Sequence, residues 1–294
     1  MNILKKIYNS KLFRALLEVA FSFTLAFLLL ASLRVILGVE SPLFVVSSGS
    51  MMPTLNIGDI IVVQKVMPAQ LGIGDIVVFR NPYVPYGSPI VHRIVNIRVD
   101  EEGNYKISTV GDAIGRGIDQ FSPWDASLLI GRVILRIPYI GNLYLFISTE
   151  DRSITIITFI IILLILFLFF GGEGKKETQK KALGYTRLLY IFAINSLLIC
   201  LVIFSLWGLG AYGFGMFGEY QLNAERYGAE NVFLVMGFMT YRIDCQVYGR
   251  IRQGALTFSW FQFLLLVLIL FNVTEVLVPI VRYRLNRESS NKNE

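Results

Sequence analysis

The chain has 294 residues, of which 54% are hydrophobic and 16% are charged, and its mean hydropathy is +0.60. This composition is too apolar and too poor in charge for an ordinary soluble domain, so it indicates a membrane protein. The formal net charge of +6 does not indicate nucleic-acid binding, because the basic excess lies in segments that flank the apolar stretches.

Four stretches are apolar over roughly the 20 residues that a membrane-spanning helix needs. They are residues 15–39, 153–170, 188–212 and 258–281. Basic residues cluster before the first stretch, between the second and third, and after the fourth. Placing these three clusters in the cytoplasm satisfies the positive-inside rule. We therefore expect about four spans, with residues 40–152 and 213–257 facing outward.

This topology predicts five regions. Residues 1–39 form a cytoplasmic N-terminus and membrane anchor, which is too long for a cleavable signal sequence and lacks an obvious cleavage site. An extracytoplasmic domain (40–152), a transmembrane helix (153–170) and a basic cytoplasmic linker (171–187) follow. Residues 188–294 form a C-terminal membrane region with two helices, the outward loop 213–257 and a cytoplasmic tail.

The first outward segment has the pattern of a small β domain. Short runs rich in Val and Ile alternate with Gly, Pro and Asn, at residues 59–66, 75–80, 90–99, 105–110 and 128–137. The second outward segment begins with several glycines at the end of a span, where close packing or a flexible exit explains them better than a nucleotide loop. We find no chemical motif in residues 213–257.

Ser50 lies in a serine-rich turn, Ser47-Ser48-Gly49-Ser50-Met51-Met52-Pro53, shortly after the first span. Because an extended chain rises only about 3.3 Å per residue, Ser50 must lie near the outer membrane face. A serine needs a neighbouring base to become a nucleophile, so the turn alone is equally compatible with a plain connection before a strand.

His92 is the only histidine and therefore the only candidate for an imidazole base. It lies in the run 90–99, where alternation directs its side chain to the same face as Ile90 and Ile94. A neutral imidazole can accept and return a proton near neutral pH, as acyl transfer requires. A structural histidine is the alternative.

Asp112 and Asp119 follow the histidine in a glycine-rich segment. A carboxylate beside a histidine base fixes its tautomer and stabilises its protonated form. Either aspartate suits this role, and either suits the alternative role of capping a turn.

These motifs resemble the signal peptidase I family in order and spacing. The resemblance rests on Ser48-Gly49-Ser50-Met51-x-Pro53, Gly74-Asp75-Ile76-Val77, His92-Arg93-Ile94, Gly111-Asp112 and Ile130-Gly131-Arg132, and it covers residues 12–150. Bacterial-type members have a lysine where this chain has His92, so the chain resembles the endoplasmic-reticulum and archaeal type. Residues 153–294 are outside the resemblance.

The resemblance implies a mainly β catalytic domain and a role for each motif residue. Ser50 would be the nucleophile and His92 the general base. The backbone N–H of Ser50 and the hydroxyl of Ser48 would form the oxyanion hole. Asp119 is favoured as the partner of the histidine and Asp112 as support, although the segment between them departs from the asparagine-rich pattern of the family.

The expected activity is therefore removal of N-terminal signal peptides from secreted preproteins by a membrane-bound serine endopeptidase. The expected partners are preprotein signal peptides, the lipid bilayer and secretion machinery, without nucleic acid. We expect no metal or cofactor, because one histidine and two separated cysteines offer no ligand cluster. The expected location is the cell membrane, or the endoplasmic-reticulum membrane in a eukaryote, with several spans and an extracytoplasmic catalytic domain.

Two other functions fit the sequence. A pilus or conjugation processing peptidase would use the same residues on another substrate. A non-catalytic membrane scaffold or transport accessory could retain a degenerate protease domain while its C-terminal half acts, and the polar residues Asn195, Asn272 and Glu275 within apolar stretches favour it. Those residues are equally suited to binding helices together.

Overall fold

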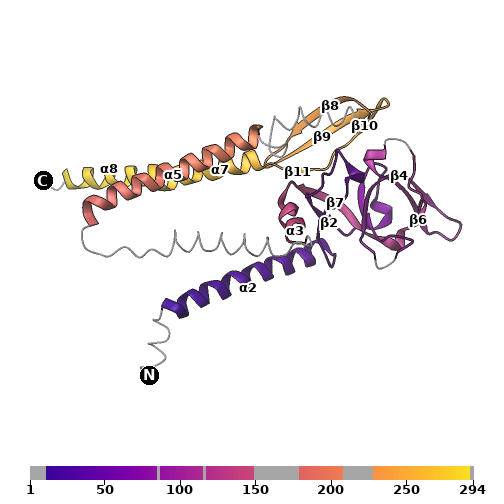
Figure 1. Cartoon of the computed structure of the whole chain (residues 1–294), viewed down its shortest axis with the longest axis horizontal. Coiled ribbons are helices and arrows are strands. Elements are labelled where there is room, and N and C mark those ends of the chain that lie inside the picture. The colour runs from indigo at the N-terminus through magenta and orange to yellow at the C-terminus, as the bar shows by residue number, and fades with distance from the viewer. Residues whose placement is uncertain (1–10, 85–86, 115–116, 149–178, 208–227, 292–294) are drawn as a thin grey trace, which may run out of the picture. The chain divides into compact units, whose positions relative to one another are not determined.

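The computed structural model (Figure 1) describes residues 11–84, 87–114, 117–148, 179–207 and 228–291. Contacts divide the chain into two compact units whose segments alternate along the sequence. The first unit comprises Met1–Phe44, Ile61–Gly111 and Gly117–Ile134, and the second comprises Val45–Ile60, Asp112–Arg116 and Leu135–Glu294. The predicted span 153–170 lies outside the described residues, as does the linker up to residue 178.

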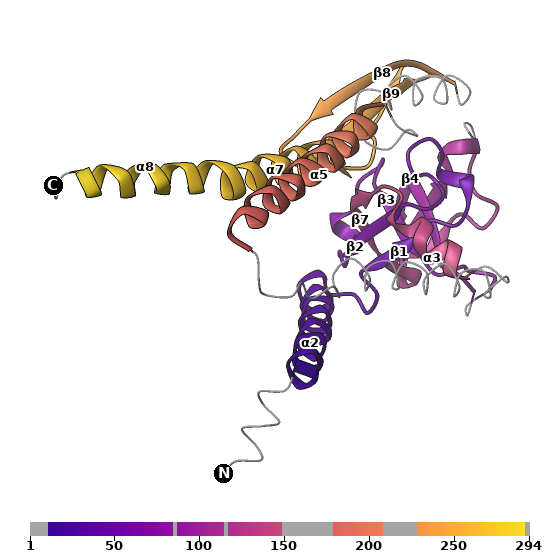
Figure 2. The same ribbon diagram turned by 60° about the vertical axis from the view of Figure 1, so that its left-hand side comes forward.

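Strands are the main regular structure between residues 43 and 137, and further strands lie between helices α5 and α7 in the sequence (Figures 1 and 2). The strands are β1 (Leu43–Val45), β2 (Ile60–Gln64), β3 (Ile76–Phe79), β4 (Ile90–Val99), β5 (Tyr105–Val110), β6 (Trp124–Asp125), β7 (Leu129–Ile137), β8 (Ala229–Met236), β9 (Thr240–Val247), β10 (Arg250–Arg252) and β11 (Thr257–Phe258). The helices are α2 (Lys11–Leu37), α3 (Ile140–Ser148), α5 (Gln179–Trp207), α7 (Trp260–Asn272) and α8 (Val278–Asn291). Short helical turns are η1 (Gly49–Met51), η2 (Pro68–Gln70), η3 (Asp112–Ile114), η4 (Ala126–Leu128) and the π-helical η5 (Val273–Leu277).

The first unit is built on an antiparallel sheet. Strand β3 pairs with β4 on one side and with β7 on the other, while β5 and β6 continue the sheet beyond β4. Apolar side chains that include Val77, Phe79 and Ile94 form its buried core, in which Phe79 stacks on Trp124 with ring centroids 4.1 Å apart. Burial of each such side chain contributes about 1.5–3 kcal/mol. This core therefore fixes the first half of β4, where His92 lies.

The prediction of a mainly β domain is confirmed. The runs predicted at residues 90–99 and 105–110 are β4 and β5, and the runs at 59–66, 75–80 and 128–137 contain β2, β3 and β7. The agreement has a local cause, because Val and Ile favour the pleated backbone and the intervening Gly, Pro and Asn favour turns.

The structure explains why glycine is required at two positions of the sequence motifs. A Cβ atom on Gly131 would lie 2.3 Å from the carbonyl oxygen of Gln64, so only glycine permits this close approach of β7 and β2. Gly74 has a φ of +99°, which a side chain would strain. Its carbonyl oxygen accepts a 2.8 Å hydrogen bond from Nη1 of Arg93, the residue after His92. Both motifs thus support the strands that carry the candidate site.

The second unit contains a β-hairpin for which the sequence analysis gave no structure. Strands β8 and β9 are antiparallel, and β10 returns along β9 so that Arg252 lies opposite Cys245. Tyr248 and Gly249, with φ of +51° and +72°, form the tight turn before β10. Strand β11 pairs with β9 and runs parallel to the end of β7, where Thr257 lies opposite Arg136. The hairpin is therefore joined to the end of β7.

Helices α5 and α7 pack against each other in the second unit and run side by side (Figures 1 and 2). The amide of Asn272 donates a 2.6 Å hydrogen bond to the Asn195 side chain, and Arg187 lies 3.4 Å from Glu275. The polar residues within these apolar stretches therefore bind the two helices together, which is one of the two roles expected for them.

Among the described residues, one helix, Trp260–Leu285, is long and apolar enough to cross a membrane, and shorter apolar helices occupy Phe23–Leu37 and Arg187–Ile203. Three of the predicted spans, 15–39, 188–212 and 258–281, overlap these helical segments. The total of four spans stays a prediction.

Candidate active site

Ser50 lies in the 3₁₀ turn η1, within a closed loop formed by residues 46–59 that we call the Ser50 loop. The ends of the loop meet, because the N–H of Val46 donates to the carbonyl of Asp59 and the N–H of Gly58 donates to that of Val46, both at 2.9 Å. Met51 and Leu55 are fully buried and anchor the loop. Ser50 is half-buried, and its hydroxyl oxygen lies 3.4 Å from that of Ser48. The loop therefore presents two neighbouring hydroxyl groups from a rigid base.

A buried ion pair supports the Ser50 loop. Nε of Arg136, near the end of β7, lies 2.5 Å from Oδ2 of Asp59, and both side chains are almost completely buried. The same guanidinium donates from Nη1 to the carbonyl oxygen of Thr54 at 3.2 Å. Removing one partner of a buried pair typically costs about 3–5 kcal/mol, because the other charge remains uncompensated. Arg136 thus ties the far end of the loop to the sheet.

The charges of this ion pair act on a buried tyrosine. Tyr241 on β9 is buried, and burial raises the pKa of its phenol to about 12. The positive charge of Arg136 lowers this pKa, and the negative charge of Asp59 raises it. The phenol therefore stays neutral over the working pH range.

Asp112 lies at the start of η3, which packs against η1. Its side chain has no exposed surface. Oδ2 accepts a 2.5 Å hydrogen bond from the hydroxyl of Thr54 in the Ser50 loop. Arg252 on β10 approaches from the other half of the sequence, with Nη1 3.8 Å from Oδ1 and 3.3 Å from the carbonyl oxygen of Asp112. The structure therefore connects Asp112 to the Ser50 loop.

His92 and Asp119 form a buried pair in the first unit. Nδ1 of His92 lies 2.6 Å from Oδ2 of Asp119, and the two side chains are 9% and 3% exposed. His92 lies opposite Val77 in the sheet, so it projects from the face that carries the core residues Val77 and Ile94, as the alternation predicts. A carboxylate on Nδ1 holds that nitrogen as a donor and leaves Nε2 as the basic nitrogen.

A chain of hydrogen bonds holds Asp119 in place. The indole Nε1 of Trp124 donates to the hydroxyl oxygen of Thr109 at 3.1 Å, and that hydroxyl donates to Oδ2 of Asp119 at 2.8 Å. The backbone N–H of Asp119 also donates to the carbonyl of Thr109 at 2.9 Å. Thr109 and Trp124 therefore fix the carboxylate that receives the imidazole.

The predicted site residues thus fall into two groups. His92 and Asp119 lie together in the first unit, and Ser48, Ser50 and Asp112 lie in the second. Of the two aspartates, Asp119 makes the hydrogen bond to His92 described above, and Asp112 accepts one from Thr54.

Four residues that support these groups were not predicted from the sequence: Thr109, Trp124, Arg136 and Arg252. Arg136 could have been noticed in the sequence, because it is a charged residue near the end of the Ile- and Val-rich run 128–137. Thr109 lies two residues after Ile107 in β5 and was indistinguishable from an ordinary strand threonine. Nothing near Arg252 pointed to Asp112, because 140 positions separate them.

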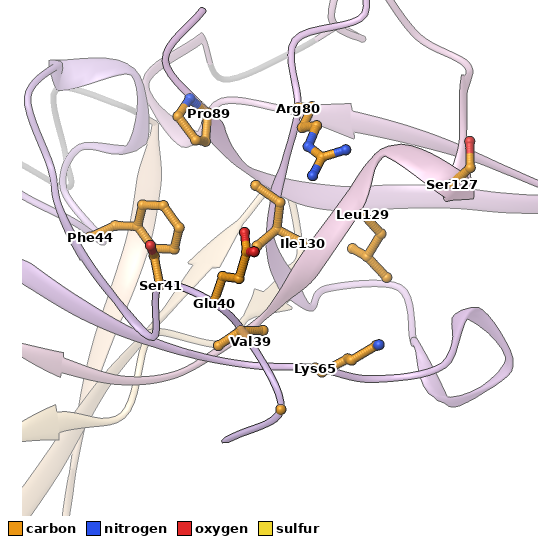
Figure 3. A pocket seen from close by; sticks show the side chains of 11 residues that line it. Val39, Glu40, Ser41, Phe44, Lys65, Arg80, Pro89, Ser127, Leu129 and Ile130 are labelled. Atoms are coloured by element: carbon orange, nitrogen blue, oxygen red, sulfur yellow. The ribbon is translucent and has the colours of Figure 1, made fainter. Parts of the chain in front are cut away.

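A cavity of about 440 Å³ lies in the first unit next to the end of α2 (Figure 3). Charged and apolar side chains share its lining, among them Glu40, Lys65, Arg80, Phe44, Leu129 and Ile130. None of Ser50, His92, Asp112 and Asp119 lines it. Within the described ranges, no group of three or more His, Cys, Asp or Glu side chains is arranged to hold a metal ion.

Comparisons with known proteins identify the family. A family model described as signal peptidase, peptidase S26, matches residues 16–101. The chain is 30% identical over 154 residues to the signal peptidase complex catalytic subunit SEC11C of Homo sapiens, a match that covers 51% of this chain and 79% of the relative.

Two further relatives give the same result. The signal peptidase complex catalytic subunit sec11 of Dictyostelium discoideum is 31% identical over 143 residues, covering 46% of this chain and 77% of the relative. The corresponding SEC11 subunit of Candida dubliniensis is 32% identical over 140 residues, covering 45% and 81%. The expected resemblance is confirmed: the chain belongs to the signal peptidase family, peptidase S26, in the branch of the SEC11 catalytic subunits, and is a serine peptidase.

Proposed function

We propose that the protein removes N-terminal signal peptides from secreted preproteins, with Ser50 as nucleophile, His92 as general base and Asp119 as the carboxylate that orients the base. The observation that carries this proposal is the buried pair between His92 and Asp119, 2.6 Å apart, in a chain of the SEC11 branch. Relatives of this chain are named catalytic subunits of a signal peptidase complex, which supports the choice of substrate.

The chemistry requires two proton transfers in each half of the reaction. Ser50 Oγ attacks the scissile carbonyl carbon while Nε2 of His92 takes the hydroxyl proton, and the same nitrogen then gives this proton to the departing amine. An ester between Ser50 and the signal peptide remains. Water attacks this ester, His92 takes the proton of the water and returns it to Ser50 as the acid leaves.

Two further groups are assigned roles in this proposal. The backbone N–H of Ser50 and the hydroxyl of Ser48 donate to the oxyanion that forms on the scissile carbonyl. Removal of one such donor costs about 3–4 kcal/mol in serine proteases. The hydroxyl oxygens of Ser48, just before η1, and Ser50 lie 3.4 Å apart, and this short separation supports the inclusion of Ser48.

The proposed setting is a membrane protein with several spans whose peptidase domain faces outward. The apolar helix Trp260–Leu285 and the apolar segments Phe23–Leu37 and Arg187–Ile203 support it. The short connection between α2 and Ser50 would keep the nucleophile near the membrane surface, where a signal peptide held in lipid presents its cleavage site. Partners in a secretion complex are part of the same proposal.

Cleavage of a preprotein by detergent-solubilised protein tests the assignment. Wild type should release the mature protein, and Ser50→Ala should lower kcat by a factor of about 10⁴–10⁶, because the nucleophile is lost. Ser47→Ala is the matched control, since Ser47 is an exposed serine of the same turn, and it should retain activity.

Full activity in Ser50→Ala would contradict the choice of nucleophile. Complete inactivity of folded wild type on all preproteins would favour the scaffold alternative. Cleavage of pilin-like precursors without cleavage of secretory preproteins would favour a specialised processing peptidase.

A further inference from the structure

The β8–β11 hairpin brings a positive charge to Asp112. Arg252 lies on β10, which pairs with β9, and β9 is joined through β11 to the end of β7. Nη1 of Arg252 lies 3.8 Å from the Asp112 carboxylate and 3.3 Å from its carbonyl oxygen. One hydrogen bond and one ion pair to the same residue indicate a defined position rather than a chance surface pair.

Because the pair is buried, the positive charge of Arg252 is needed to compensate the carboxylate of Asp112. Asp112 has no exposed surface, and the side chain of Arg252 is only 15% exposed. An ionised carboxylate in such a place is strongly unfavourable unless an opposite charge or several donors compensate it. Arg252 supplies the charge, and the hydroxyl of Thr54 supplies a donor at 2.5 Å.

Asp112 links Arg252 to the loop that carries the proposed nucleophile, Ser50. Its turn, η3, packs against η1, and Thr54 lies four positions after Ser50 in the same closed loop. A protonated or displaced Asp112 would release the Thr54 hydroxyl and loosen the packing beneath η1. Small displacements of a nucleophile reduce the rate strongly, because attack needs a near-contact geometry.

We propose that Arg252 is a positioning residue of the peptidase, which holds Asp112 ionised and in place and thereby sets the geometry of the Ser50 loop. The proposal rests on the assignment of Ser50 as nucleophile. It makes the β8–β11 hairpin an integral part of the active enzyme, although Arg252 lies far beyond residues 16–101, which the family model matches.

The test compares the full-length proteins Arg252→Ala, Arg252→Lys and Arg250→Ala in preprotein cleavage. Arg250 is the matched control, since it is an exposed arginine on the same strand. We expect Arg252→Ala to lower kcat roughly ten- to a hundredfold with little change in KM, as loss of a charge-assisted hydrogen bond implies. Arg252→Lys should recover most of kcat because it retains the charge, and Arg250→Ala should match wild type.

A double-mutant cycle separates positioning from general stability. In an Asp112→Asn background, Arg252→Ala should lower kcat less than threefold, because a neutral amide needs no compensating charge. Equal effects of Arg252→Ala in both backgrounds would overturn the proposal, as would wild-type kcat in Arg252→Ala. If Arg252→Ala does not fold, Arg252→Gln decides, because it keeps a long polar side chain without the charge: wild-type kcat in Arg252→Gln would also overturn the proposal.

The outcomes distinguish this proposal from the proposed function. Inactive Ser50→Ala beside fully active Arg252→Ala would leave the peptidase assignment intact and remove only the role of Arg252. Active Ser50→Ala would remove both.

Discussion

Asp119 and Asp112 are buried aspartates with different partners, one in each unit of the molecule. Asp119 accepts a hydrogen bond from the neutral hydroxyl of Thr109 and lies 2.6 Å from His92. Asp112 accepts from the hydroxyl of Thr54 and faces the guanidinium of Arg252. Arginine is charged at all working pH values, whereas histidine acquires its charge when it takes a proton.

This difference indicates that the carboxylates of Asp112 and Asp119 have different roles. The charge of Asp112 is compensated before substrate arrives, so it serves to hold the Ser50 loop in shape. In the proposed mechanism, the charge of Asp119 stabilises most strongly the imidazolium that His92 becomes during the reaction, so it would stabilise the transition state more than the ground state. We therefore expect the two aspartates to differ in their effect on kcat.

Replacing each of the two aspartates by asparagine tests this comparison directly and has its largest expected effect on kcat. Asp119→Asn should lower kcat about 10⁴-fold, because an amide favours the wrong imidazole tautomer and cannot stabilise the imidazolium. Asp112→Asn should lower kcat only about ten- to a hundredfold, since its role is structural support. Single-turnover cleavage of a preprotein by the two variants, with folding checked by thermal unfolding, measures both numbers. Equal losses would show that the different partners have no catalytic meaning.

The sequence predicted the parts of this comparison that depend on local patterns. Strand β4 was predicted at its observed bounds, because alternation of Val and Ile with polar residues is visible within a few positions. The face that His92 occupies followed from the same alternation. The choice of Asp119 over Asp112 as the histidine's partner came from the family resemblance, since spacing alone suited both residues.

Contacts between distant segments could not be predicted in this way. Tyr241, Ile243, Cys245 and Val247 alternate with polar residues in β9, yet the pairing of β9 with β11, which in turn pairs with the end of β7, depends on the fold. Asp59 and Arg136 are 77 positions apart, and charged residues of this kind are normally exposed, so their burial as a pair has no sequence signature. Arg252 is a third case of the same kind.

A second, smaller effect concerns the stability of the unit that holds Asp112 at high pH. Burial raises the pKa of Tyr241 to about 12, whereas an unfolded tyrosine titrates near ~10. The folded protein therefore keeps a proton that the unfolded chain loses, so the contribution of Tyr241 is complete below pH ~10 and is lost as the pH rises towards 12. The loss amounts to about 3 kcal/mol of unfolding free energy.

Alkaline titration of wild type and Tyr241→Phe measures this contribution. Tyrosinate absorbance should show one fewer phenol ionising near pH 12 in the variant, and the thermal midpoint of the variant should fall less steeply between pH 10 and 12. An unchanged titration curve would show that the surroundings of Arg136 are more hydrated than the burial of Tyr241 indicates.

The smallest expected effect concerns the neutral donor to Asp119. Thr109→Val keeps the shape of the side chain and removes its hydroxyl, so Oδ2 of Asp119 loses a donor and the indole N–H of Trp124 loses its acceptor. Loss of a hydrogen bond to a charged group is worth about 1.5 kcal/mol, so kcat should fall roughly tenfold. Thr109→Ser restores the hydroxyl and should restore kcat, which separates the hydrogen bond from the packing of the methyl group. If Thr109→Ser were as slow as Thr109→Val, the methyl group and not the donor would hold Asp119, and the contrast between a neutral and a charged partner would lose its basis in the first unit.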